Sequence, residues 1–218
     1  MLDINGWDIR KALRLLHGSN PTLFEWSFSP IVYRDSPFAQ QLRQLLARYF
    51  SSRSGLWHYL HMAEGNYQEY LRGDRVRSKK YFYVLRPILA CRWILEYGTP
   101  PPMRFSVLAA HQLDERMKDT VYQLLTQKQC APERNYIPRI DHLNAYLETS
   151  IAQVKQALTC LPPSQSGSWE ELDQLFLSVW TALFDPIHHI FSIAEQTALT
   201  VGRRIRSTKK VMPTQKWA

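Results

Sequence analysis

The stretch "RSKKYFYVLRPILACRWI", residues 77–94, decides the fold, because it is apolar enough to form a buried helix at the centre of a helical protein. Five cations nevertheless lie within it: Arg77, Lys79, Lys80, Arg86 and Arg92. A buried cation is costly unless an anionic group meets it. Either acidic residues of the same chain pair with these cations, or an anionic ligand does.

A helical wheel at about 100° per residue places part of this charge on one face. The face consists of Lys79, Tyr83, Arg86 and Ala90, with Phe82 and Trp93 beside it, whereas Lys80 and Arg92 project elsewhere. Pro87 removes one backbone amide and is expected to kink the helix near Arg86.

A line of cations flanked by aromatic rings is typical of phosphate and base recognition, since arginine binds phosphate in a bidentate way and rings stack on bases. We therefore predict that Lys79, Tyr83 and Arg86 bind a nucleotide or RNA. The alternative is internal pairing with Glu64, Glu69 or Glu96, and it is the stronger alternative for Lys80 and Arg92. The further candidate ligand contacts are Lys80, Asn66 and Lys11, and Asn66 is equally suited to a contact between helices.

The composition supports a well-packed protein with phosphate-bearing partners. Of the 218 residues, 45% are hydrophobic and 12% aromatic, and the net charge is +8, which excludes global disorder. Two basic blocks, residues 72–104 and 203–216, carry much of the positive charge. No apolar run is long enough to span a bilayer, and the three cysteines form no paired framework, so we expect a cytoplasmic protein with no membrane partner.

The expected architecture is mainly α, with one or two strands near the N-terminus. "LDI" (residues 2–4) resembles the end of a strand, and "PIVY" (residues 30–33) is a short β-branched strand candidate. Helices are predicted after Asp8, from Pro21, after Ser36, from about residue 51 to Gly73 and through most of the second half. "PPSQSGS" (residues 162–168) is the best linker candidate.

Three long blocks closely resemble the YcgL-type predicted nucleotidyltransferases of the DNA polymerase beta superfamily, a group linked to RNA repair. The blocks are residues 2–35, residues 58–94 and "PPPMRF" at residues 100–105, and residues 124–148 are a looser match. The resemblance covers about residues 1–150. It is specific because tryptophan, tyrosine and proline recur in a fixed order over dozens of positions.

The resemblance implies nucleotidyl transfer with two Mg²⁺ ions. In the superfamily these ions are held by an Asp-x-Asp pair that follows a Gly-Ser motif and by a third carboxylate on a later strand, an arrangement that lowers the pKa of the attacking hydroxyl and stabilises the leaving pyrophosphate. Asp3 in "LDI" would be this third carboxylate, both a catalytic residue and a metal ligand.

The sequence departs from the superfamily pattern at the other two carboxylates. The Gly-Ser motif and the Asp-x-Asp pair are expected upstream of Asp3, where this chain has only Met1 and Leu2. We therefore expect a family member that lacks its N-terminal catalytic part, binds Mg²⁺ poorly and is inactive alone. A separate chain that supplies the missing half would be one partner, and a nucleotide or RNA another.

The sequence thus predicts four parts: residues 1–35 as a remnant of the nucleotidyltransferase core, residues 36–160 as a helical substrate-facing region, residues 161–168 as a linker, and residues 169–218 as a helical pair with a basic tail. The alternative function is a non-catalytic helical protein that binds nucleic acid or a protein partner through its basic helix and tail.

Overall fold

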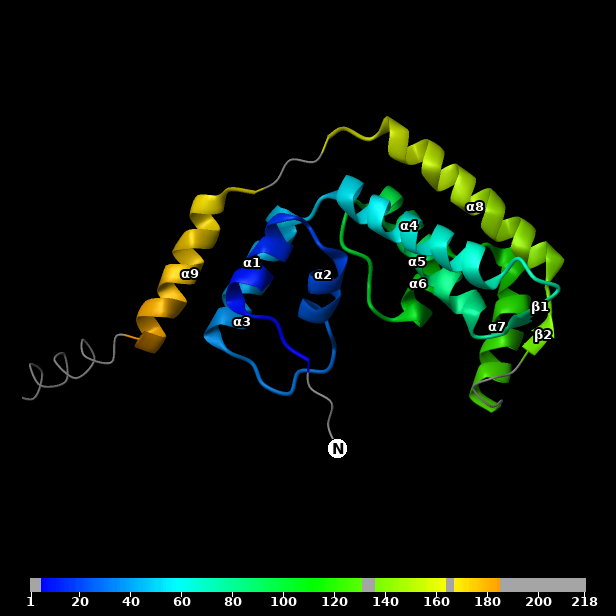
Figure 1. Cartoon of the computed structure of the whole chain (residues 1–218), viewed down its shortest axis with the longest axis horizontal. Helices are drawn as coiled ribbons and strands as arrows, with labels where there is room; N and C mark the ends of the chain where they lie inside the picture. Colours follow the sequence, from blue (N-terminus) through cyan, green and yellow to red (C-terminus); the bar gives the residue numbers. More distant parts are fainter. Residues whose placement is uncertain (1–4, 131–135, 164–166, 185–218) are drawn as a thin grey trace, which may run out of the picture. The chain divides into compact units, whose positions relative to one another are not determined.

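The computed structural model describes residues 5–130, 136–163 and 167–184 (Figure 1). The chain divides into two compact units, residues 1–169 and residues 170–218. The described part of the second unit belongs to α9 (Trp169–Phe184). The four-part division made from the sequence remains a prediction.

The first unit is mainly α, as predicted, with a small two-stranded sheet. Its elements in chain order are α1 (Ile9–His17), α2 (Pro21–Ser27), α3 (Pro37–Tyr49), α4 (Ser52–Tyr70), β1 (Arg75–Arg77), α5 (Lys80–Tyr97), α6 (Phe105–Gln112), α7 (Glu115–Cys130), β2 (Tyr136–Pro138) and α8 (Asp141–Cys160). Within the described ranges, no helix has both the length and the apolar character needed to cross a bilayer.

The central helix predicted from residues 77–94 is α5. It packs along α4, and α8 lies against both, as Figure 1 shows. Leu85, Ile88 and Leu89 of α5 are completely buried, so this helix forms the centre of the core. It runs without a break through Pro87. It starts at Lys80 rather than at Arg77, because Arg75–Arg77 pairs antiparallel with Tyr136–Pro138.

The first three helices begin where local signals predict. Asp8 is the N-cap of α1 and accepts a hydrogen bond from the Lys11 amide. Pro21 is the first residue of α2, after the N-cap Asn20. Ser36 caps α3 by accepting from the Ala39 amide.

The strand predicted for Pro30–Tyr33 is wrong. Residues 30–33 form no strand, and the side chains of Ile31, Val32 and Tyr33 are 66%, 58% and 85% exposed. A β-branched run becomes a strand only when a neighbouring strand accepts its backbone hydrogen bonds, and among the described residues none lies beside it. The strand expected at Leu2–Ile4 lies outside the described residues.

Candidate functional site

The candidate ligand residues of α5 and its N-cap lie along one side of that helix. We call Lys79, Lys80, Tyr83 and Arg86 the cationic face of α5. The Tyr83 ring is 46% exposed. Phe82, which was expected to flank this face, is instead buried in the core and packs edge-on against Phe105. The accessible rings of the face therefore come from tyrosines.

Lys80 lies between two tyrosine rings. Its ammonium nitrogen is 3.4 Å from the centroid of the Tyr70 ring at the end of α4, and 4.5 Å from the Tyr83 ring one turn ahead on α5. These cation–π contacts bring Lys80 to the same surface as Tyr83, although the helical wheel placed it elsewhere. Asn66 lies one turn before Tyr70 on α4, and its side-chain amide donates to the Met62 carbonyl of the same helix.

Two further cations lie on β1, just before α5, and contact a tyrosine of β2. The Arg77 guanidinium lies 5.3 Å from the centroid of the Tyr136 ring and donates to its hydroxyl at 3.0 Å. Arg75, on the same strand, donates to the Tyr136 carbonyl at 3.4 Å. Among the described residues, neither Arg75, Arg77 nor Lys80 forms an ion pair. The negative charge that would neutralise them is not provided by this part of the chain.

Arg86, in contrast, has an acidic partner. Its guanidinium lies 3.0 Å from a carboxylate oxygen of Glu25 on α2 and also donates to the Met103 carbonyl at 3.3 Å. Tyr59 of α4 donates to the same Glu25 oxygen at 2.7 Å. Burial raises the pKa of the Tyr59 phenol, and the Glu25 carboxylate raises it further, so Tyr59 remains a donor at any ordinary pH.

Internal pairing was the alternative to ligand binding, but the expected acids are not the ones that Arg86 uses. Glu64 pairs with Lys155 of α8, and Glu96 accepts a hydrogen bond from Gln112. The partner is Glu25, 61 residues before Arg86. No local pattern links these two positions, because the contact depends on how α2 lies against α4 and α5.

Arg92 forms its hydrogen bonds with neutral groups. Its guanidinium donates to the Gln112 carbonyl, to the Tyr146 hydroxyl and to the Ser150 hydroxyl at 3.2, 2.8 and 3.1 Å, and it lies 5.1 Å from the centroid of the Tyr146 ring. This arginine joins α5 to α6 and α8, so its hydrogen-bond partners lie within the chain, although they are not the glutamates named from the sequence.

Two of the predicted site residues lie away from this face or cannot be placed. Lys11 on α1 extends over the Trp7 ring, 5.3 Å from its centroid, and Trp7 stacks on Trp26 of α2. No contact in the described part of the chain joins Lys11 to the cationic face of α5. Asp3, the predicted catalytic and metal-binding carboxylate, lies outside the described residues.

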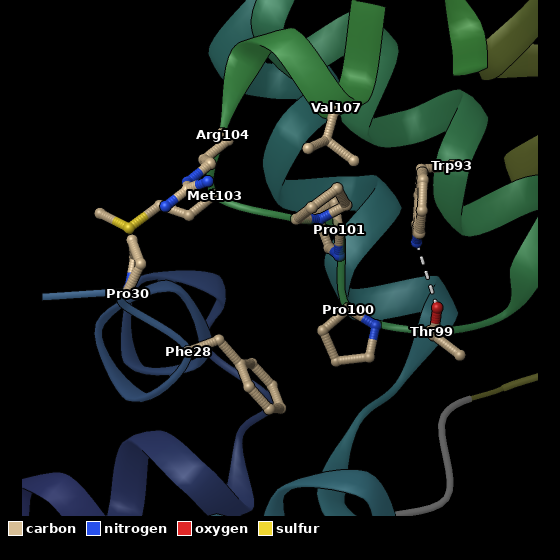
Figure 2. A pocket seen from close by; sticks show the side chains of 10 residues that line it. Phe28, Pro30, Trp93, Thr99, Pro100, Pro101, Met103, Arg104 and Val107 are labelled. Atoms are coloured by element: carbon tan, nitrogen blue, oxygen red, sulfur yellow. Dashed lines mark hydrogen bonds between the residues drawn. The ribbon is translucent and has the colours of Figure 1, made fainter. Parts of the chain in front are cut away.

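An apolar pocket lies farther along α5. It has a cavity volume of about 520 Å³ and is built from the end of α2, the proline-rich segment between α5 and α6, and Trp93. Figure 2 shows Trp93 and Arg104 on opposite sides of the pocket and Phe28 on a third side. The Trp93 indole donates to the Thr99 hydroxyl at 3.1 Å, drawn as the dashed line. The sequence pattern did not predict a pocket here.

Comparison with known proteins shows the family to which the chain belongs. The sequence model of the RNA repair pathway DNA polymerase beta family matches residues 1–178, so the chain is a member of that family and of the polymerase-beta-like nucleotidyltransferase superfamily. A protein of Bacillus subtilis (strain 168), described as "Uncharacterized protein YcgL", is 42% identical over 180 residues, which cover 82% of this chain and 69% of that protein. No solved structure matches significantly.

Proposed function

We propose that this protein is the helical, substrate-facing part of an RNA-repair nucleotidyltransferase, and that the cationic face of α5 binds the phosphates of a nucleotide or RNA. Lys79, Lys80 and Arg86 bind phosphate oxygens. Tyr83 and Asn66 contact a base or a sugar. The family match supports the class of chemistry, and the ring contacts of Lys80 support a binding role for this face.

The observation that carries the proposal is the Lys80 ammonium between the rings of Tyr70 and Tyr83. A lysine held by aromatic faces is oriented without being neutralised, since a ring supplies no net negative charge. Arg77 is held in a similar way by Tyr136. Such alternation of cations and rings suits a single strand, whose phosphates meet the cations while its bases stack on the rings.

The transfer reaction itself requires carboxylates that hold Mg²⁺. Among the described residues, no group of three His, Cys, Asp or Glu side chains is placed to hold a metal ion, so this part of the chain does not fit one. The full 218-residue sequence also contains no Asp-x-Asp pair. We propose that Asp3 contributes one of the carboxylates that the reaction requires.

The phosphate-binding role is tested with a labelled single-stranded RNA and fluorescence anisotropy at low salt. Lys80→Ala and Arg77→Ala should each weaken binding by about tenfold, because a charge-assisted contact is worth about 1.5–3 kcal/mol, and each should reduce the salt slope by about one phosphate contact. Lys118→Ala is the matched control, since Lys118 pairs with Glu115 on α7. If Lys80→Ala and Arg77→Ala both bind RNA as tightly as the Lys118→Ala control, the proposed function is wrong.

The expected inactivity of the 218-residue chain is tested by incubating the purified protein with labelled NTPs, RNA, and Mg²⁺ or Mn²⁺. We expect no incorporation above a sample without protein. Incorporation that disappears in Asp3→Ala would show that this chain holds a complete site and would overturn the expected inactivity.

A further inference from the structure

The pocket beside Trp93 has a wall chemistry that favours a flat, apolar ring. Nearly all of its surface is carbon, and its lining includes the rings of Phe28 and Trp93 and three successive prolines, Pro100–Pro102. Proline has no amide hydrogen, so this wall offers carbonyl acceptors and few donors. The volume of about 520 Å³ lies in the usual range for small-molecule sites.

Trp93 is oriented before any ligand arrives. Its indole nitrogen is held by Thr99, and the Tyr97 ring packs against it at a centroid distance of 4.4 Å, with His111 edge-on at 5.6 Å. Phe28, in contrast, is 50% exposed. An indole that is already fixed is suited to stacking on a flat ligand, because little side-chain entropy is lost when the ligand binds.

The ionisable group on the pocket wall is a cation. Arg104 is the one ionisable residue that lines it, and Arg86 donates to the carbonyl of Met103, which also lines it. No carboxylate is among the lining residues. A ligand that combines an apolar ring with an anionic group matches this distribution better than a neutral apolar side chain does.

The pocket also continues the cationic face of α5. Trp93 is seven residues after Arg86, two helical turns farther on the same side, which is a rise of roughly 10 Å. A nucleotide whose phosphates lie near Arg86 therefore has its base within reach of Trp93. The cationic face of α5 suits the phosphate end of a nucleotide, and the pocket suits its base.

We infer that this pocket binds the base of a nucleotide, either a free mononucleotide or the terminal nucleotide of an RNA, beside Phe28 and Trp93, with its phosphate toward Arg86 and Arg104. The inference deepens the proposed function and rests on it, since the phosphate is assigned to the same face of α5. It adds a site for the base, which would let the protein bind a nucleotide more tightly than a phosphate compound that has no base.

The test compares AMP with ribose 5-phosphate, which carries the same sugar and phosphate but no base, by isothermal titration calorimetry. AMP should bind at least about fivefold more tightly, because stacking of one base on an aromatic side chain is worth about that factor or more. Val107→Phe, which fills the pocket, and Phe28→Ala, which removes an exposed wall, should both abolish the difference and leave ribose 5-phosphate binding unchanged. Tyr122→Ala removes an equally exposed ring on α7 and should change nothing.

The outcomes separate this inference from the proposed function. Equal binding of AMP and ribose 5-phosphate, or an AMP preference that survives both Val107→Phe and Phe28→Ala, overturns the base pocket while phosphate and RNA binding can still stand. Base-dependent AMP binding without RNA binding supports the pocket and overturns the proposed RNA-binding face. Self-association that Val107→Phe abolishes, with no effect on AMP, shows that a second copy of the chain fills the pocket and overturns the inference.

Discussion

The inner and outer sides of α5 hold their polar and charged side chains in different ways. On the inner side, Arg92 and a polar cluster around Asn144 find all their partners within the chain. Asn144 accepts from the Tyr81 hydroxyl and donates to the Leu71 carbonyl, both at 2.8 Å. On the outer side, Lys80 is oriented by rings alone. The comparison teaches that a cation on a buried helix signals a ligand most clearly where the fold gives it neither an ion pair nor hydrogen bonds.

The largest effect is expected on the inner side. Asn144→Leu should lower the free energy of unfolding by about 3 kcal/mol, because the buried Leu71 carbonyl and the Tyr81 hydroxyl each lose a partner. Urea denaturation followed by circular dichroism measures it. Asn66→Leu, at a half-buried position on α4, is the control and should cost less than about 0.5 kcal/mol.

The same Asn144→Leu protein, measured under conditions where it is folded, should bind RNA like the parent. Weaker RNA binding by the folded variant would break the division between an inner structural side and an outer binding side.

Arg86 has a place on both sides of α5: it pairs with Glu25 inside the protein, and it is proposed to bind phosphate. Variants of Arg86 and Glu25 can separate its contribution to stability from its contribution to RNA binding. Arg86→Met should lower the free energy of unfolding by about 2 kcal/mol, since Glu25 is then left without its cation while only 20% of its side chain is exposed. RNA affinity should fall about tenfold. The double variant Glu25→Gln/Arg86→Met should regain most of the stability, because it removes the uncompensated charge.

The double variant decides what Arg86 does. If it regains stability but still binds RNA weakly, Arg86 binds phosphate directly. If both stability and RNA affinity return, Arg86 only positions α2 against α5, and the cationic face of α5 is reduced to Lys79 and Lys80.

The smallest expected effect on stability concerns His58 of α4, which interacts electrostatically with Glu25, the acid that pairs with Arg86. Burial lowers the pKa of His58, although the Glu25 carboxylate partly opposes this shift. The unfolded chain therefore binds a proton more readily than the folded chain does. Stability is highest above the unfolded pKa of about 6.5 and decreases as the pH falls through it toward the lower folded pKa.

Denaturation midpoints at pH 7.5 and pH 5.5 measure this dependence. We expect the difference between them to be smaller in His58→Gln than in the parent protein. An unchanged difference would mean that another group, not His58, takes up the proton on unfolding.

The starts of the first three helices could be predicted from the local sequence. Asp8, Pro21 and Ser36 mark the starts of α1, α2 and α3 as expected, because capping and the fixed φ of proline act within a single turn. Pro30–Tyr33 failed as a strand and Arg75–Arg77 formed one, because strands depend on a partner elsewhere in the chain. The mainly α character was predictable and the sheet was not.

The candidate site, too, was predictable in part: its residues could be found in the sequence, but their surroundings could not. The residues of the cationic face were visible in the sequence because helical periodicity places Lys79, Tyr83 and Arg86 together within two turns. The groups that define their environment were not visible. Tyr70 lies over Lys80 and Glu25 beside Arg86 only because α4 and α2 pack against α5.

The sequence by itself determined the family, the mainly α character and the side of α5 on which charge collects, since these depend on residue order and short-range periodicity. The tertiary structure alone decided how each cation is held: Arg86 pairs with Glu25, Arg92 is hydrogen-bonded by neutral groups of α6 and α8, and Lys80 pairs with no described acid. The physical reason is that the strength of a charge interaction depends on separation and burial in space, which the distance along the chain does not reveal.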